Sequence, residues 1–217
     1  MIAGAVLALL ASPLLAPQLL AFPHRVETPI GPVYSEQPLA PAMLRQAVAI
    51  TRERIGTSPL AATRETRPVF VTQGGWRWRW LSTTAHGTFA ITRPLTRAVM
   101  VNATDPVSGL VSNSRPRGRG RQLGGILAHE FCHGLIRRHF GVIRAETFPR
   151  WKVEGYCDHI AGESTLTAAE ATRLEAAGLD HPALLYFRGR ERVARELAAN
   201  GGSVDALFRD TALPSGR

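Results

Sequence analysis

Apolar residues recur at helical spacing along several segments of the chain. The stretch PAMLRQAVAITRERIG, residues 41–56, begins with a proline, ends with a glycine and places Leu44, Ala47, Val48 and Ile55 on one side. Proline is favoured at the first helical position and glycine at the end of a helix, so this pattern predicts a helix. The same reasoning predicts a mainly helical C-terminal part, with helices within residues 123–141, 148–164, 166–178, 183–202 and 203–208.

Short runs rich in β-branched and aromatic residues precede these helices. They span residues 68–72, 76–80, 87–92 and 98–102 and are separated by Gly, Pro and polar residues, which predicts strands. In WRWRW, residues 76–80, alternation on a strand would put three indoles on one face and two guanidinium groups on the other. Strands followed by helices indicate an α+β fold with a small mixed or antiparallel sheet.

The first residues form a separate hydrophobic segment. Residues 2–22 carry no charge and are numerous enough to cross a bilayer. Both a removable signal peptide and an uncleaved membrane anchor fit this stretch, although it lacks the basic start of a typical signal. We therefore expect residues 1–22 to direct the chain out of the cytoplasm, secreted or membrane-anchored, and residues 23–217 to form one domain.

The net charge of +9 comes almost entirely from arginine, since Lys152 is the only lysine. The basic stretch RPRGRGR, residues 115–121, and the tryptophans of residues 76–80 would suit a protein that binds nucleic acid or a membrane surface. A solvated loop and a half-buried hairpin are simpler interpretations of the two stretches. We expect no nucleic-acid partner, and membrane association only through residues 2–22.

The segment LGGILAHEFCHGLIRRHFG, residues 123–141, contains the pattern H-E-x-x-H. His129 and His133 are four residues apart, so on a helix they point in directions only about 40° apart. Their ring nitrogens can therefore occupy two corners of a tetrahedral zinc ion, with Glu130 beside the metal as a general base. The H-E-x-x-H pattern also arises by chance, so the pattern alone does not establish a metal site. A third ligand must be identified to support one.

Two residues compete for the third ligand position. His139 lies where the metzincin pattern has its third histidine, but that pattern needs a glycine where this chain has Ile136, and no methionine follows for a Met-turn. We therefore expect His139 to end the helix. Glu154 follows His133 by 21 residues, enough for a turn and the start of a second helix, and Gly155 would let the two helices approach. Asp158 falls on the same helical face as Glu154.

H-E-x-x-H followed by this E-x-x-x-D pair resembles the gluzincins, the thermolysin-like zinc metallopeptidases, and the W-x-x-E-G-Y stretch is similar to that of peptidase MA-like bacterial proteins. The resemblance covers roughly residues 120–165. It implies that His129, His133 and Glu154 bind Zn²⁺, that Glu130 is the general base and that Asp158 orients a ligand histidine, His129 being the expected one.

The resemblance implies a zinc-dependent metallohydrolase, a peptidase that cleaves amide bonds in a peptide or protein substrate. A zinc-activated water would attack the carbonyl, and Glu130 would take its proton and return it to the leaving amine. The alternative is a gluzincin-like module that binds without catalysis, with structural zinc or none. Gluzincins also use a Tyr or His to stabilise the oxyanion, and four residues are available here: Tyr156, His159, His181 and Tyr186.

Two further points stay open at this level. In gluzincins an edge strand binds extended peptide, and AVMVNAT, residues 98–104, is either that strand or an internal one. Cys132 and Cys157 each follow a proposed metal ligand by three residues, so they either form a disulfide or remain separate buried thiols.

Overall fold

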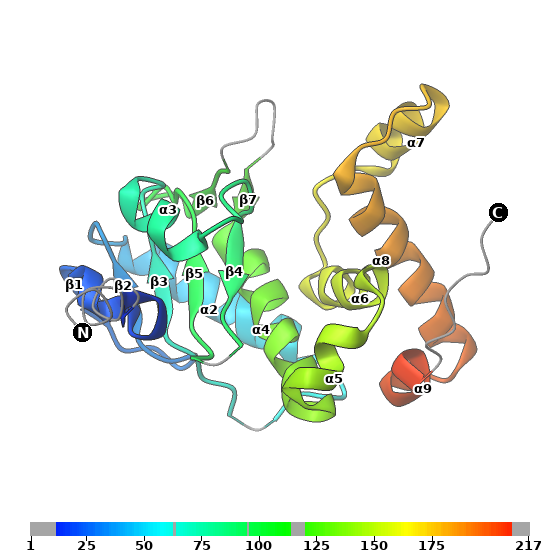
Figure 1. Cartoon of the computed structure of the whole chain (residues 1–217), viewed down its shortest axis with the longest axis horizontal. Coiled ribbons are helices and arrows are strands. Elements are labelled where there is room, and N and C mark those ends of the chain that lie inside the picture. Colours follow the sequence, from blue (N-terminus) through cyan, green and yellow to red (C-terminus); the bar gives the residue numbers. More distant parts are fainter. Residues whose placement is uncertain (1–11, 63, 95, 114–119, 210–217) are drawn as a thin grey trace, which may run out of the picture.

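A computed structural model describes residues 12–62, 64–94, 96–113 and 120–209 of the chain (Figure 1). A sheet with its covering helices forms one half and a helical array forms the other. The strands are β1 (His24–Val26), β2 (Val33–Ser35), β3 (Val69–Val71), β4 (Ala90–Thr92), β5 (Val99–Val101), β6 (Leu110–Val111) and β7 (Arg121–Gln122). The helices are η1 (Pro17–Leu20), α2 (Pro41–Gly56), α3 (Trp76–Ser82), α4 (Leu123–Phe140), α5 (Val142–Thr147), α6 (Arg150–Ala161), α7 (Ala168–Ala176), α8 (Pro182–Ala199) and α9 (Val204–Arg209).

The main sheet has the strand order β1-β2-β3-β5-β4. Strands β2, β3 and β5 are parallel, whereas β1 and β4 run antiparallel to their neighbours at the two edges. Every residue of β3 and β5 is buried, as expected for parallel strands that are covered on both faces. The predicted α+β class with a small mixed sheet is therefore confirmed.

Alternating residues of the central strands contribute to two different cores. The valines of β3 and β5 join a large cluster with α2, α4 and α6, while Phe70 and Met100 point to the other face and pack with Trp78 and Leu81 of α3. The sheet therefore lies between α3 on one face and α2 with α4 on the other (Figure 1). This arrangement holds α4, the helix with the H-E-x-x-H pattern, firmly against the sheet.

The strand prediction for residues 76–80 is wrong, because these residues form helix α3. Trp78 and Leu81, three residues apart, are buried, whereas Trp76 and Trp80 are exposed. This is a helical burial pattern, in which residues i and i+4 share a face and residue i+2 points away. Over only five positions, alternating tryptophans fit either the two-residue period of a strand or the four-residue spacing of a helix. Burial against Phe70 and Met100 selects the helix.

The segment 98–104 supplies an internal strand and not an edge, because β5 pairs with both β3 and β4. The edge next to α4 is β4, which comes earlier in the chain. If an edge strand beside α4 binds peptide, that strand is therefore β4.

Residues 1–11 of the predicted signal or anchor lie outside the described residues, as do Arg115, Arg117 and Arg119 of the basic stretch. Within the described ranges, no helix combines the length and apolar character needed to cross a bilayer. The end of the hydrophobic segment packs on the domain, where Leu20 and Phe22 contact the Phe70 cluster and Arg77 Nε donates to the Leu20 carbonyl at 2.8 Å.

The helical half is built around α6, which packs between α4 and α8 (Figure 1). Helix α7 begins with a capping box, in which Thr167 and Glu170 each accept a hydrogen bond from the other's backbone N–H. Gly155 was expected to bring α6 close to α4, but it faces α8 instead. A Cβ atom there would collide with the backbone of Gly189, so the glycine pair sets the close approach of α6 and α8.

Candidate metal centre

Helix α4 carries the H-E-x-x-H residues in its buried middle. Leu127, Phe131 and Leu135 fill the core beneath it, and His129 and Glu130 are only 8% and 7% exposed. Burying such polar groups costs free energy unless each finds a partner. The partners come from two other elements, since α6 contacts His129 and β4 contacts Glu130.

The structure brings His129, His133 and Glu154 together into one group of potential metal ligands. Nε2 of His129 lies 3.2 Å from Nε2 of His133 and 3.3 Å from Oε2 of Glu154, and the His133–Glu154 distance is 3.6 Å. In a tetrahedral zinc site with ligand bonds of about 2.0–2.2 Å, neighbouring donor atoms lie about 3.3–3.6 Å apart. The three donor atoms therefore fit three corners of one tetrahedron.

Asp158 contacts the far side of the His129 ring. Its Oδ1 lies 2.8 Å from Nδ1 of His129, so this nitrogen donates to the carboxylate and Nε2 is the ring atom that faces the other two ligands. Asp158 is fully buried, and Arg121 Nη2 approaches the same oxygen at 3.4 Å. Arg121 also lies 3.6 Å from Glu163, so this end of the basic stretch neutralises charge behind the centre.

The charges at the centre are strongly coupled. Burial by itself lowers the pKa of His129, but the hydrogen bond and charge of Asp158, followed by those of Glu154, raise it well above its ordinary value. Burial would raise the pKa of Glu154, yet the charge of His133 and hydrogen bonds from both histidines hold it far below its usual range. Without a metal, a proton shared among these groups balances the buried carboxylates, and a cation would take over that role.

Glu130 projects beside the three ligands and is held by Thr92 at the end of β4. Thr92 Oγ1 lies 2.5 Å from Oε2 of Glu130 and 2.9 Å from the Glu130 backbone carbonyl. One carboxylate oxygen is therefore fixed by the edge strand, which leaves the other available to a substrate or water. Sequence patterns do not predict this contact, because 38 residues separate its partners.

A second basic group lies behind α4. The Arg67 guanidinium is buried against the ring of Phe131, 5.6 Å from its centroid, and forms a 2.7 Å ion pair with the buried Glu65. Burial and the charges of Arg97 and Arg137 lower the pKa of Arg67 to about 10, while Glu130 acts in the opposite direction. Gly134 makes room for this group, since a side chain there would overlap the guanidinium.

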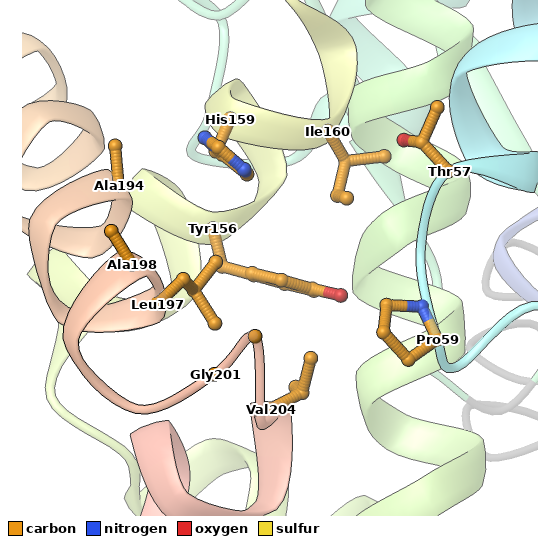
Figure 2. Close-up of a pocket in the computed structure, with 11 residues that line it drawn as sticks. Thr57, Pro59, Tyr156, His159, Ile160, Ala194, Leu197, Ala198, Gly201 and Val204 are labelled. Atoms are coloured by element: carbon orange, nitrogen blue, oxygen red, sulfur yellow. The ribbon is translucent and has the colours of Figure 1, made fainter.

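Of the other candidates, most lie away from the centre. His139 lies near the end of α4, which stops at Phe140 before Gly141, and its Nε2 lies 2.7 Å from Asp205; it contributes nothing to the metal group. Tyr156 and His159 point from the opposite face of α6 into a separate cavity lined by α8 and α9 (Figure 2). His181 accepts a hydrogen bond from Ala183 N–H and so caps α8.

Tyr186 is the remaining oxyanion candidate, and the charge of Glu154 acts on its hydroxyl. Its hydroxyl accepts a 2.7 Å hydrogen bond from Arg150 Nη2. Burial, followed by the negative charge of Glu154, raises the pKa of Tyr186. The glycine contact between α6 and α8 therefore joins the helix that carries Tyr186 to the helix that carries Glu154.

No family model matches this chain, and neither the curated proteins nor the solved structures include a match to it. The function is therefore inferred from the geometry of the centre.

Proposed function

We propose that this protein is a zinc-dependent peptidase of the gluzincin type. The observation that carries the proposal is the meeting of His129, His133 and Glu154, from two helices, at the donor spacing of a tetrahedral site. Two imidazoles and one carboxylate are the ligand set of catalytic zinc sites that keep a fourth position open. When bound, zinc would polarise a carbonyl and lower the pKa of a water molecule.

Glu130 is the proposed general base. It lies beside the ligands but outside the ligand group, and Thr92 fixes one of its oxygens. The other oxygen accepts a proton from the attacking water and later passes it to the leaving amine nitrogen.

The proposed substrate is an extended peptide lying along β4. Phe89 O and Arg93 N bond to β5, so in the alternating antiparallel pattern the backbone groups of Ala90 and Thr92 face away from β5. Such an edge can pair with an added strand once Arg137 Nη1, which donates to the Thr92 carbonyl at 3.4 Å, has moved aside. Because Thr92 also touches Glu130, a peptide on this edge would pass directly beside the general base.

Tyr186 is the proposed oxyanion-stabilising residue. Its phenol hydroxyl stays protonated at neutral pH and can donate a hydrogen bond to a carbonyl oxygen that gains negative charge. Arg150, which donates to the same hydroxyl, orients the phenol and adds positive charge.

The test is cleavage of a peptide library by the purified chain, with and without a chelator. We expect cleavage that the chelator stops and that added zinc restores. Glu130→Gln should abolish cleavage while the protein still binds one zinc ion, and Glu53→Gln, at an exposed carboxylate of α2, should change neither property. Zinc binding with no cleavage of any peptide would instead favour the non-catalytic binding module, and loss of zinc in Glu130→Gln would show that its role is misassigned.

A further inference from the structure

The two cysteines of the chain lie on the two helices that carry the metal ligands. Cys132 on α4 follows His129 by three residues, and Cys157 on α6 follows Glu154 by three. Three residues correspond to about 300° of helical rotation, so each cysteine lies about 60° to one side of its ligand. Both side chains are fully buried where α4 and α6 pack together.

The two sulfur atoms are in direct contact. Their Sγ–Sγ distance is 2.6 Å, about 0.6 Å longer than a covalent S–S bond of about 2.05 Å. The chain contains no other cysteine, so each can pair within the chain only with the other. Neither belongs to the group of potential metal ligands in the described part of the chain, so their approach is not explained by metal binding.

We propose that Cys132 and Cys157 form a disulfide that covalently joins α4 to α6 beside the metal ligands. The loop that it closes contains His133 and Glu154, and His129 lies one helical turn outside it. The bond limits how far the second and third ligands can separate when the helices open. It therefore makes retention of the metal depend on the oxidation state of the chain.

The oxidation needs an electron acceptor, for which we specify a small-molecule disulfide such as oxidised glutathione. One cysteine thiolate attacks it, forms a mixed disulfide and releases one glutathione thiolate; the second cysteine thiolate then displaces the other glutathione. The protein loses two protons and two electrons, and the acceptor becomes two thiols. Because both sulfurs are buried in the folded chain, the exchange takes place before α6 has packed on α4. The extracytoplasmic location expected from residues 2–22 would supply such oxidants.

The test begins with refolding of the full chain, metal-free, in a glutathione buffer at an oxidising ratio. After trypsin digestion without reductant, we expect residues 122–137 and 153–173 to appear as one cross-linked species that reductant separates. An intact chain that keeps two titratable thiols after this treatment would overturn the proposal. This measurement requires neither bound metal nor catalysis, so it is independent of the proposed function.

A second measurement compares oxidised and reduced wild-type protein loaded with zinc. Release of zinc to a chromophoric chelator should be on the order of tenfold faster from the reduced form, and reductant should raise the unfolded fraction at a fixed guanidinium concentration roughly 100-fold. The double variant Cys132→Ser/Cys157→Ser should release zinc like reduced wild type and should not respond to reductant. If that variant does not fold, the wild-type comparison decides alone, and equal zinc release from its two forms would refute the link to the metal.

Discussion

Thr92 Oγ1 lies 2.5 Å from the carboxylate of Glu130, which joins the edge strand of the sheet to the proposed general base. The Thr92 hydroxyl has one proton to donate, and two acceptors of Glu130 lie within its reach: the carboxylate and the backbone carbonyl. A peptide that adds to β4 would therefore bind on the strand that also fixes the base.

Replacing Thr92 tests this coupling. Thr92→Val keeps the shape of the side chain but removes the hydrogen bond to a charged group, which is worth about 1.5–3 kcal/mol. We expect kcat for peptide cleavage to fall about tenfold or more with zinc content unchanged. Thr92→Ser, which keeps the hydroxyl, should retain most of the activity, and equal losses in both variants would contradict the role of the hydrogen bond.

Asp158 offers a test of how the ligand histidine is oriented. Asp158→Asn removes the charge that receives the His129 Nδ1 proton, so we expect zinc affinity to fall about 10- to 100-fold in competition with a chelator. The matched control is Asp205→Asn, which alters a similar contact with His139 at 2.7 Å on the surface. Unchanged zinc affinity in Asp158→Asn would show that the carboxylate does not orient the ligand.

Metal binding should depend steeply on pH. Asp158 and Glu154 raise the pKa of His129 in the metal-free protein, so a metal must displace a proton from this ring at neutral pH. Zinc affinity should therefore rise as pH increases towards the raised pKa and level off above it. Isothermal titration in buffers of different ionisation enthalpy should show proton release on binding, and a pH-independent affinity between pH 6 and 8 would contradict the assignment.

The same shifts predict how the stability of the metal-free protein responds to pH. The folded pKa of His129 lies above the unfolded value of about 6.5, so its contribution is complete below that value and is lost as pH rises through the folded pKa. The pKa of Glu154 and that of Asp158 are lowered in the folded state, so their contributions are lost only as pH falls through those low values. Urea unfolding should thus show stability declining on the alkaline side, and this decline should vanish in zinc-loaded protein.

Tyr186 can be separated from the three other oxyanion candidates by mutation. Tyr186→Phe removes the hydroxyl that Arg150 contacts, and we expect kcat to fall about 100-fold with little change in KM, as for loss of an oxyanion donor. His159→Gln changes a residue of the separate cavity in Figure 2 and should leave kcat unchanged. A fall in kcat for His159→Gln, with kcat unchanged in Tyr186→Phe, would instead assign oxyanion stabilisation to the face of α6 that carries His159.

Much of the fold was predictable where local signals agree. The helix over residues 41–56 has matching bounds in the prediction and the structure, because its apolar spacing and terminal residues point to the same limits. The capping box at Thr167 was also predictable from local sequence. The error at residues 76–80 has a physical origin: five residues cannot distinguish the two periods, and packing on Phe70 and Met100 selects the helix.

The candidate centre was predictable for residues on its two helices and not for those from the sheet. The four-residue spacings of His129 with His133 and of Glu154 with Asp158 are visible in sequence because helix geometry is regular. Thr92 and Arg67 reach the centre only through the fold of distant segments, and no local pattern marks them. Arg121 belongs to the basic stretch of residues 115–121, but that pattern does not predict its contact with Asp158. Strand pairing likewise determines which of β4 and β5 lies at the edge of the sheet. The structure places β4, the earlier of the two in the chain, at that edge.

X-ray absorption at the zinc edge tests the central claim most directly, because it reports the atoms bound to the metal in the purified chain. We predict one zinc ion per chain with only nitrogen and oxygen neighbours at about 2.0–2.2 Å, including two imidazoles. Glu154→Ala should lose one oxygen neighbour or the metal itself. A sulfur neighbour at about 2.3 Å, or a wild-type chain that retains no zinc, would contradict the account.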